Sequence, residues 1–388
     1  MGIAALLLAV PLLLQESCPN CLHRGVLPCK AHVELPAAEE QPGPENPVLY
    51  CSWAASCAAC EGTLWIDCPR CARGELTKEV EERRSVIKAW MESNALEREL
   101  ERSVPRLETN RFRLVIDVRE LPEGKKKLSG HALAHRLAHD VEHVAALVAE
   151  HYQMSAQDYR SKMRMWLWST LATHQQVQQK FQGTITTGNF KLLGRDPVFS
   201  TWTDPPHFDT VSKVRALFAH DAGHMLVSNA FQPTWVGDNG GGWLDAGLGH
   251  WYEYELFAHT VNYCLEESAL LENYENGQWR AAVRRRLERE KDPFLPGLLP
   301  KRSGAMSAAE DALCWSFYDW LLTQPGVLRK LMIDLKQKKP AREVLAQHLG
   351  MDLFATEDAW RAWVAVNYPL KGDEPRAAPK GGKKDKGK

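Results

Sequence analysis

The stretch FAHDAGHMLV, residues 218–227, decides how the larger part of the chain is interpreted. Apolar residues around it recur at the 3.6-residue spacing of an amphipathic helix, namely at Val214, Leu217, Phe218 and Leu226. We therefore predict a helix over residues 211–230. On this helix His220 and His224 lie one turn apart on the same face, where they can bind one metal ion together.

The residue after the first histidine bears on the chemistry. In an H-E-x-x-H helix it is a glutamate that acts as a general base. Here it is Asp221, whose side chain is one methylene shorter and reaches about 1.5 Å less far. A misplacement of about 1 Å can cost on the order of a hundredfold in rate. The pattern is therefore altered at its catalytic position.

A second predicted helix follows a glycine-rich loop and begins WLDAGLGHWYEYELF, residues 243–257. Together the two segments resemble the gluzincin group of zinc peptidases, which includes thermolysin and the aminopeptidase N type. In aminopeptidase-like members, the second helix opens with a W-L-x-E-G-x-A pattern whose glutamate is the third zinc ligand. The residues that align with that helix are Trp243, Leu244, Gly247 and Glu253. Segment 312–364 looks like the helical tail of bacterial gluzincin-like proteins, so the resemblance covers roughly residues 105–368.

The chain departs from this pattern at the third ligand. With Trp243 and Gly247 aligned, the ligand position holds Ala246, which cannot bind zinc, and Asp245 stands just before it. We therefore expect a metallopeptidase-like protein that lacks normal peptidase activity and acts as a zinc-stabilised binding or structural module.

The alternative is an active but atypical zinc peptidase with Asp221 as general base. Its zinc ligands would be His220, His224 and either Asp245 or His250. If the site is lost, His250 and Glu253 are polar residues that brace the two helices. In a third interpretation the protein is chaperone-like or a scaffold, and its cysteine-rich segment performs the function.

Eight of the ten cysteines lie between residues 18 and 71, and seven of these, together with His32, form two repeats of the template C-x2-C-x7-C-x2-[CH]. The first repeat contains Cys18, Cys21, Cys29 and His32, and the second contains Cys57, Cys60, Cys68 and Cys71. Paired C-x2-C turns favour two structural zinc knuckles, with a disulfide framework as the alternative. Gly25 and Gly62 suit the tight turns that follow the first pair of each repeat.

The cysteine repeats loosely resemble the zinc module of DnaJ-type chaperones, over about fifty residues. In that module the ligands pair between repeats, so the grouping of the ligands here stays open. Cys51 falls outside the template, and we expect Cys264 and Cys314 to be small buried hydrophobic residues.

The rest of the chain predicts an α+β fold that is mainly helical. Expected elements are a helix over 75–102, a strand over 111–118, helices over 131–151 and 155–182, and loops with short strands over 183–209. The tryptophans of MRMWLWSTL are expected in the core. The expected domains are a signal peptide or anchor (1–17), tandem zinc knuckles (18–74), a connecting helix (75–102), a gluzincin-like domain (103–370) and a disordered basic tail (371–388).

The net charge of the chain and its apolar N-terminal segment bear on its binding partners and its location in the cell. The net charge of −1 argues against generic polyanion binding, and the knuckles lack the basic and aromatic interleaving typical of nucleic-acid binding. We therefore expect protein or peptide partners. The apolar run from Ile3 to Leu14 favours export or anchoring on the extracytoplasmic side, with membrane association through the N-terminus. No Lys or Arg precedes this run, so a cytoplasmic protein is the alternative.

Overall fold

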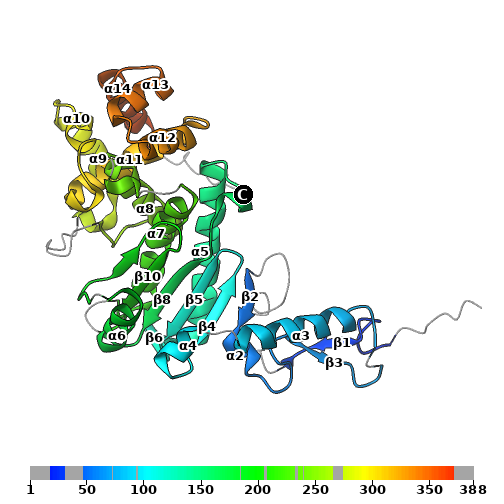
Figure 1. The fold of residues 1–388 in the computed structure, drawn as a ribbon. Helices are drawn as coiled ribbons and strands as arrows, with labels where there is room; N and C mark the ends of the chain where they lie inside the picture. The colour runs from blue at the N-terminus through cyan, green and yellow to red at the C-terminus, as the bar shows by residue number, and fades with distance from the viewer. Residues whose placement is uncertain are drawn as a thin grey trace, which may run out of the picture. The chain divides into compact units, whose positions relative to one another are not determined.

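The computed structural model consists of two compact units, residues 1–46 with 50–96 and residues 47–49 with 97–388 (Figure 1). It describes residues 18–30, 47–71, 73–92, 95–183, 185–204, 208–231, 235–238, 240–264 and 274–370. Three sequence predictions lie outside the described residues: the segment 1–17, the ligand His32 and the tail 371–388. In the part of the chain that is described, no helix has the length and apolar character needed to span a membrane.

The smaller unit is organised by a two-stranded sheet. In it β1 (Val26–Pro28) pairs antiparallel with β3 (Trp65–Asp67). The short helix α2 (Ser52–Ala55) lies between the two strands in the sequence. Each strand occupies the seven-residue spacer of one cysteine repeat, so strand pairing joins the two repeats.

One long helix covers the smaller unit. This helix, α3 (Thr77–Glu92), buries Val80 and Ile87. The segment 75–102, where the sequence predicts one helix, contains α3 and a second helix, α4 (Ala95–Leu100).

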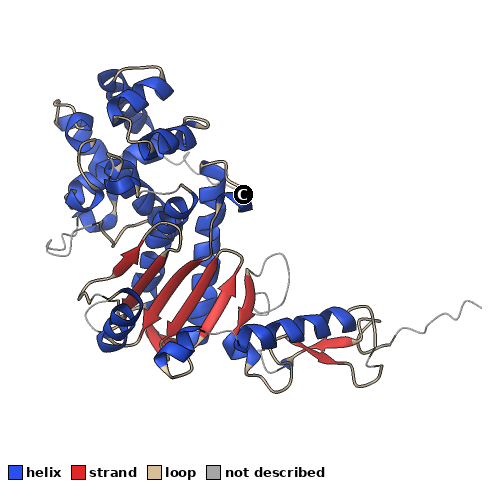
Figure 2. Ribbon diagram, in the orientation of Figure 1, coloured by secondary structure: helices blue, strands red, loops and turns tan. Residues whose placement is uncertain are grey.

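The larger unit is α+β and mainly helical, and its centre is a mixed sheet (Figure 2). The strand order is β2 (Val48–Cys51), β4 (Arg106–Thr109), β5 (Phe112–Asp117), β8 (Met163–Trp168), β10 (Val198–Trp202) and β9 (Phe190–Leu192). The three strands β5, β8 and β10 are parallel, whereas β4 and β9 run antiparallel to β5 and β10. The strand predicted over 111–118 is confirmed as β5.

The helix predicted over 155–182 is wrong in its centre. The sequence MRMWLW forms strand β8, which pairs with β5 on one side and β10 on the other. A central parallel strand is covered on both faces and is therefore apolar at nearly every position, so it lacks the alternation that identifies a half-buried strand. Its tryptophans do lie in the core, with Trp166 4% and Trp168 0% exposed.

Helices make up most of the remaining chain. In chain order they are α5 (Gly130–His151), α6 (Leu171–Gln182), α7 (Val211–Ala230), α8 (Gly242–Phe257), α9 (Trp279–Arg289), α10 (Leu295–Leu298), α11 (Ala308–Leu322), α12 (Val327–Lys336), α13 (Ala341–Leu349) and α14 (Leu353–Asn367). A small hairpin joins β6 (Glu120–Glu123) to β7 (Lys126–Ser129), and short 3-10 turns lie at Ala156–Asp158, Val236–Asp238, Tyr274–Gly277 and Ser303–Ala305. The helices predicted over 131–151 and 211–230 are confirmed as α5 and α7.

The pair α7 and α8 positions the histidines. The side-chain oxygen of Thr210 accepts a hydrogen bond from the backbone N–H of Lys213 and caps the start of α7. From there α7 packs against α5 and α8, and α8 packs against α11. The two helices approach closely at Gly223, where an added Cβ would lie 2.7 Å from the ring of Tyr252. Because α7 also packs against α5 and strand β8, it is buried on more than one face.

Candidate metal centres

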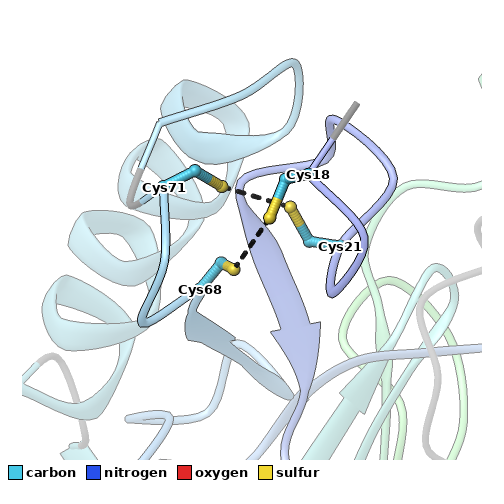
Figure 3. Close-up of side chains that lie close together, drawn as sticks. All are labelled: Cys18, Cys21, Cys68 and Cys71. Atoms are coloured by element: carbon cyan, nitrogen blue, oxygen red, sulfur yellow. Dashed lines mark hydrogen bonds between the residues drawn. The ribbon is translucent and has the colours of Figure 1, made fainter. Parts of the chain in front are cut away.

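Four cysteines of the smaller unit converge on one point, two from each repeat (Figure 3). They are Cys18, Cys21, Cys68 and Cys71. The sulfurs of Cys21 and Cys71 are 3.2 Å apart, and those of Cys18 and Cys68 are 3.9 Å apart. Four sulfurs about 2.3 Å from a tetrahedral ion would be separated by about 3.8 Å. The group therefore has the size and donor set to hold a metal ion.

A second group forms at the other end of the two strands. It contains Cys29, Cys57 and Cys60, and the sulfurs of Cys29 and Cys57 are 4.0 Å apart. The sequence predicts His32 as a ligand, but this residue lies outside the described part of the chain. The three thiols can hold a metal ion if one further donor completes the set.

Antiparallel pairing explains why each group draws on both repeats. The register sets Val26 opposite Asp67 and Pro28 opposite Trp65, so the start of one repeat meets the end of the other. Hydrogen bonds extend the pairing on both sides, from Cys29 N–H to the Leu64 carbonyl (2.8 Å) and from Cys68 N–H to the Gly25 carbonyl (2.9 Å). The spacer strand separates the two halves of any one repeat, so those halves belong to different groups.

The turns of the first pairs have the geometry that the sequence predicts. Gly25 and Gly62 have φ values of +79° and +87°, which favour glycine. The backbone N–H of Gly25 donates to the sulfur of Cys21 at 3.3 Å. The pKa of the Cys18 thiol is lowered to about 7, chiefly because the backbone N–H of Asn20 donates to it. Such donors stabilise the thiolate form that binds metal.

In the larger unit, two histidines and one cysteine form a compact triangle. The Nε2 atoms of His220 and His224 are 3.2 Å apart. The sulfur of Cys264 lies 3.4 Å from the first of these nitrogens and 3.3 Å from the second. Nitrogen and sulfur ligands of one tetrahedral zinc ion would be about 3.3–3.6 Å apart. The three atoms therefore fit one ion, and among the described residues no fourth donor atom joins this group.

Cys264 overturns the prediction that it is a small buried hydrophobic residue. It lies on the loop after α8, is only partly buried, and turns its sulfur toward both histidines. Burial raises the pKa of its thiol well above the usual range, and the nearby Lys191 opposes this shift. A divalent cation would supply the charge that a buried thiolate lacks. Cys314 is 1% exposed, as the sequence predicts.

Asp245, expected as a third ligand, contacts the opposite nitrogen of His224. Its Oδ1 atom lies 3.0 Å from His224 Nδ1. Burial favours a higher pKa for Asp245, but the attraction and hydrogen bond to His224 lower it overall. A carboxylate on Nδ1 holds the imidazole in the tautomer whose Nε2 is free for a metal. Asp245 is therefore placed to orient a ligand.

His250, the other expected third ligand, packs its ring 4.7 Å from that of His220. Its Nε2 atom lies 3.4 Å from Asp311 Oδ2, and both side chains are 0% exposed. His250 can also form a group with His220 and Glu253, whereas Cys264 is the residue that joins the Nε2 atoms of both histidines.

Helix α8 packs closely against the two histidines. Ala246, at the expected ligand position, is fully buried. One turn later, a Cβ added at Gly249 would lie 2.4 Å from His224 Nε2. The backbone of α8 thus passes directly beside the ligand atoms. A sequence signal for Cys264 exists only in retrospect: a thiol a few residues beyond the helix that follows the histidine pair.

Asp221, the predicted general base, is paired with a lysine. Its Oδ1 atom accepts a hydrogen bond from Lys191 Nζ at 2.7 Å. The aspartate side chain is 4% exposed and the lysine 28%. Burial favours a lower pKa for Lys191, but the charges of Asp221 and Cys264 raise it overall. Lys191 comes from the edge strand β9, so the sheet supplies a cation beside the three-residue group.

Sequence comparison finds neither a known protein family nor a curated protein that matches the chain.

Proposed function

We propose that the larger unit is a zinc-dependent hydrolase of peptide bonds. The observation that carries this proposal is the triangle of His220 Nε2, His224 Nε2 and Cys264 Sγ, with separations of 3.2–3.4 Å. Three protein ligands with a fourth position open are typical of catalytic zinc, whereas structural zinc has four protein ligands. An ion held there would act as a Lewis acid on a carbonyl or a water. The gluzincin-like order of the two helices supports peptides as the substrate class.

In this proposal each residue of the site has a separate role. Asp221 would accept a proton from the attacking water, and Lys191 donates a hydrogen bond to one of its carboxylate oxygens. Asp245 orients His224 through Nδ1. The thiolate of Cys264 takes the place of the carboxylate that Ala246 cannot provide.

A second candidate is a metal-holding module without catalysis. The ion pair between Asp221 and Lys191 favours it, because the ammonium group already occupies one oxygen of this carboxylate at 2.7 Å. The shorter side chain of Asp221 also favours this second candidate. In this candidate the triangle stabilises the fold or presents a binding surface for peptides.

We also propose that the smaller unit is a pair of structural zinc sites that serves protein partners. The donor sets support this, because thiolate groups at tetrahedral spacing select soft or borderline ions such as zinc. His32 is the proposed fourth ligand of the group that contains Cys29, Cys57 and Cys60.

Metal content and activity separate the two candidates for the larger unit. Zinc per chain should fall by one in His220→Ala, and peptide hydrolysis, followed by mass spectrometry of a peptide mixture, should be lost. Asp221→Asn should keep all the zinc and lose hydrolysis. Full zinc with no hydrolysis in the unaltered protein would favour the module. Unchanged zinc in His220→Ala would contradict both candidates.

A further inference from the structure

Glu253 on α8 is fully buried and contacts the segment that carries Cys264. Its Oε1 atom accepts hydrogen bonds from the backbone N–H of Val261 (2.6 Å), the backbone N–H of Asn262 (3.3 Å) and the side-chain amide of Asn262 (2.8 Å). Cys264 follows two residues later. A single carboxylate oxygen therefore anchors the loop that delivers the sulfur.

The other oxygen of the same carboxylate faces a histidine of the triangle. Glu253 Oε2 lies 3.3 Å from Nδ1 of His220, and both atoms are buried. Their alignment falls short of a hydrogen bond, and neither atom has another hydrogen-bond partner among the described residues. Within the described part of the chain, each of these two atoms therefore has the other as its candidate partner. A carboxylate that accepts the Nδ1 proton leaves Nε2 free, and Nε2 is the atom that faces Cys264.

We propose that Glu253 is the positioning residue that couples His220 to the Cys264 loop, and this inference rests on the proposed metal site. A third ligand on α8 would be held by the helix itself. A ligand on a loop needs a separate anchor, because loops are more mobile than helices and sites need fixed ligands. Glu253 provides that anchor from α8 and orients His220 with the same side chain.

Two substitutions separate the two contacts of Glu253. In Glu253→Gln the amide oxygen can still accept from the loop, but the NH2 group replaces the acceptor that faces His220. That group would donate to Nδ1 and favour the tautomer with a proton on Nε2, which blocks the ligand atom. Glu253→Ala removes both contacts. We expect Glu253→Gln to weaken Zn2+ binding at this site by at least about tenfold, and Glu253→Ala to weaken it more.

The affinity is measured on the full chain by competition with a chelator. The zinc retained by a His220→Ala/His224→Ala double variant serves as the baseline for ions in the smaller unit. If the unaltered protein binds no more zinc than this baseline, the metal site and the proposed function fail together. If it binds one more ion and Glu253→Gln binds that ion as tightly as the unaltered protein, the inference about Glu253 alone is overturned. Should Glu253→Ala not fold, Glu253→Gln decides the matter by itself.

A matched control is Glu357→Gln. Glu357 on α14 is also a buried glutamate, 2% exposed, and it also accepts two backbone N–H groups, those of Phe294 and Leu295, at 2.8 and 2.9 Å. This variant should lower the free energy of unfolding without weakening Zn2+ binding at the group of His220, His224 and Cys264. An equal loss of affinity in both variants would show that Glu253 acts only through the stability of the fold.

A spectroscopic readout tests the loop contact directly. In protein loaded with Co2+, a bond from the Cys264 sulfur to cobalt gives a charge-transfer band in the absorption spectrum. The band is obtained by subtracting the spectrum of the Cys264→Ala counterpart of each variant. At saturating Co2+ this band should persist in Glu253→Gln and Glu357→Gln and be lost in Glu253→Ala. A full band in Glu253→Ala would overturn the role of Glu253 as the anchor of the loop.

Discussion

The sulfur of Cys264 lies 3.3 Å from Nε2 of His224, although 40 residues separate them in the sequence. This contact adds a third candidate donor to the pair of histidines. In the proposed metal site, the Cys264 thiolate on the loop after α8 takes the place of a carboxylate donor on α8. A thiolate binds zinc at about 2.3 Å and brings softer chemistry than a carboxylate.

The first prediction concerns Cys264 itself. Cys264→Ala should remove one zinc per chain, measured by elemental analysis of the purified full-length protein, because two histidines alone hold the ion weakly. Cys314→Ala is the control, since Cys314 is also a cysteine of the larger unit and its sulfur contacts Met306 instead of the histidines. It should keep all the zinc. Equal zinc in both variants would rule out Cys264 as a ligand.

The second prediction concerns the grouping of the cysteines. Cys21 and Cys71 belong to one group, whereas Cys29 belongs to the other. Cys21→Ser and Cys71→Ser should each lose one zinc, and the double variant should lose no more than either single variant. Cys21→Ser combined with Cys29→Ser should lose two. The opposite pattern of losses would mean that each repeat binds its own ion.

The third prediction concerns the approach of α8 to the histidines. In Gly249→Ala the new methyl group would lie 2.4 Å from His224 Nε2, so the imidazole must move. We expect loss of the zinc ion proposed at His220, His224 and Cys264, and a fall of about 1–3 kcal/mol in the free energy of unfolding from overpacking. Gly297→Ala is the matched control, because Gly297 is also helical and no atom lies within 4 Å of the added Cβ. In the control, metal analysis should show an unchanged zinc content and urea unfolding an unchanged free energy of unfolding.

The fourth prediction concerns the pair Asp221 and Lys191. Lys191→Met leaves the Asp221 carboxylate buried without its cation, which should lower the free energy of unfolding by about 1–3 kcal/mol. Adding Asp221→Asn to this variant should restore part of the loss, since the buried charge is then removed. Urea unfolding of the single and double variants measures both effects. A double variant as unstable as the sum of the two single variants would argue against the ion pair.

The fifth prediction concerns pH and His151, at the end of α5. Burial lowers its pKa from 6.5 to about 4, and its Nδ1 lies 3.1 Å from the hydroxyl of Tyr252. The buried neutral ring stabilises the fold above pH 6.5, and this contribution is lost as pH falls from about 6.5 to 4, where the unfolded chain binds a proton first. Allowing for partial exposure, the loss should be on the order of 2 kcal/mol.

The difference in unfolding free energy between the unaltered protein and His151→Gln, followed from pH 7.5 to 4, isolates this contribution. It should shrink as the pH falls, because glutamine does not titrate. A difference that stays constant over this range would mean that His151 titrates normally in the folded state.

Local patterns alone predicted several parts of this protein. The helix over 211–230 and the strand over 111–118 follow from side-chain periodicity, which depends only on near neighbours. The same holds for the positive φ values at Gly25 and Gly62, because the C-x2-C turn itself requires them. The placement of His220 and His224 on one helical face is equally local.

Other parts depended on contacts between distant segments. The residues of β8 were predicted to be helical, because burial on both faces removes the alternation of polar and apolar side chains. Their pairing with β5 and β10 shows that they form a strand. The grouping of the cysteines was open until the antiparallel register of β1 and β3 brought Cys18 to Cys68.

The third member of the histidine group shows the same division. The sequence determines that α7 places two histidines on one face and that Ala246 offers no donor atom, since both statements follow from residue type and helical spacing. Only the tertiary structure decides that Cys264 completes the triangle, because this requires α8 to pass beside the histidines at Gly249 and Glu253 to hold the returning loop. Helical periodicity is encoded over a few residues, whereas the meeting of a loop and a helix forty residues apart depends on the packing of the whole unit.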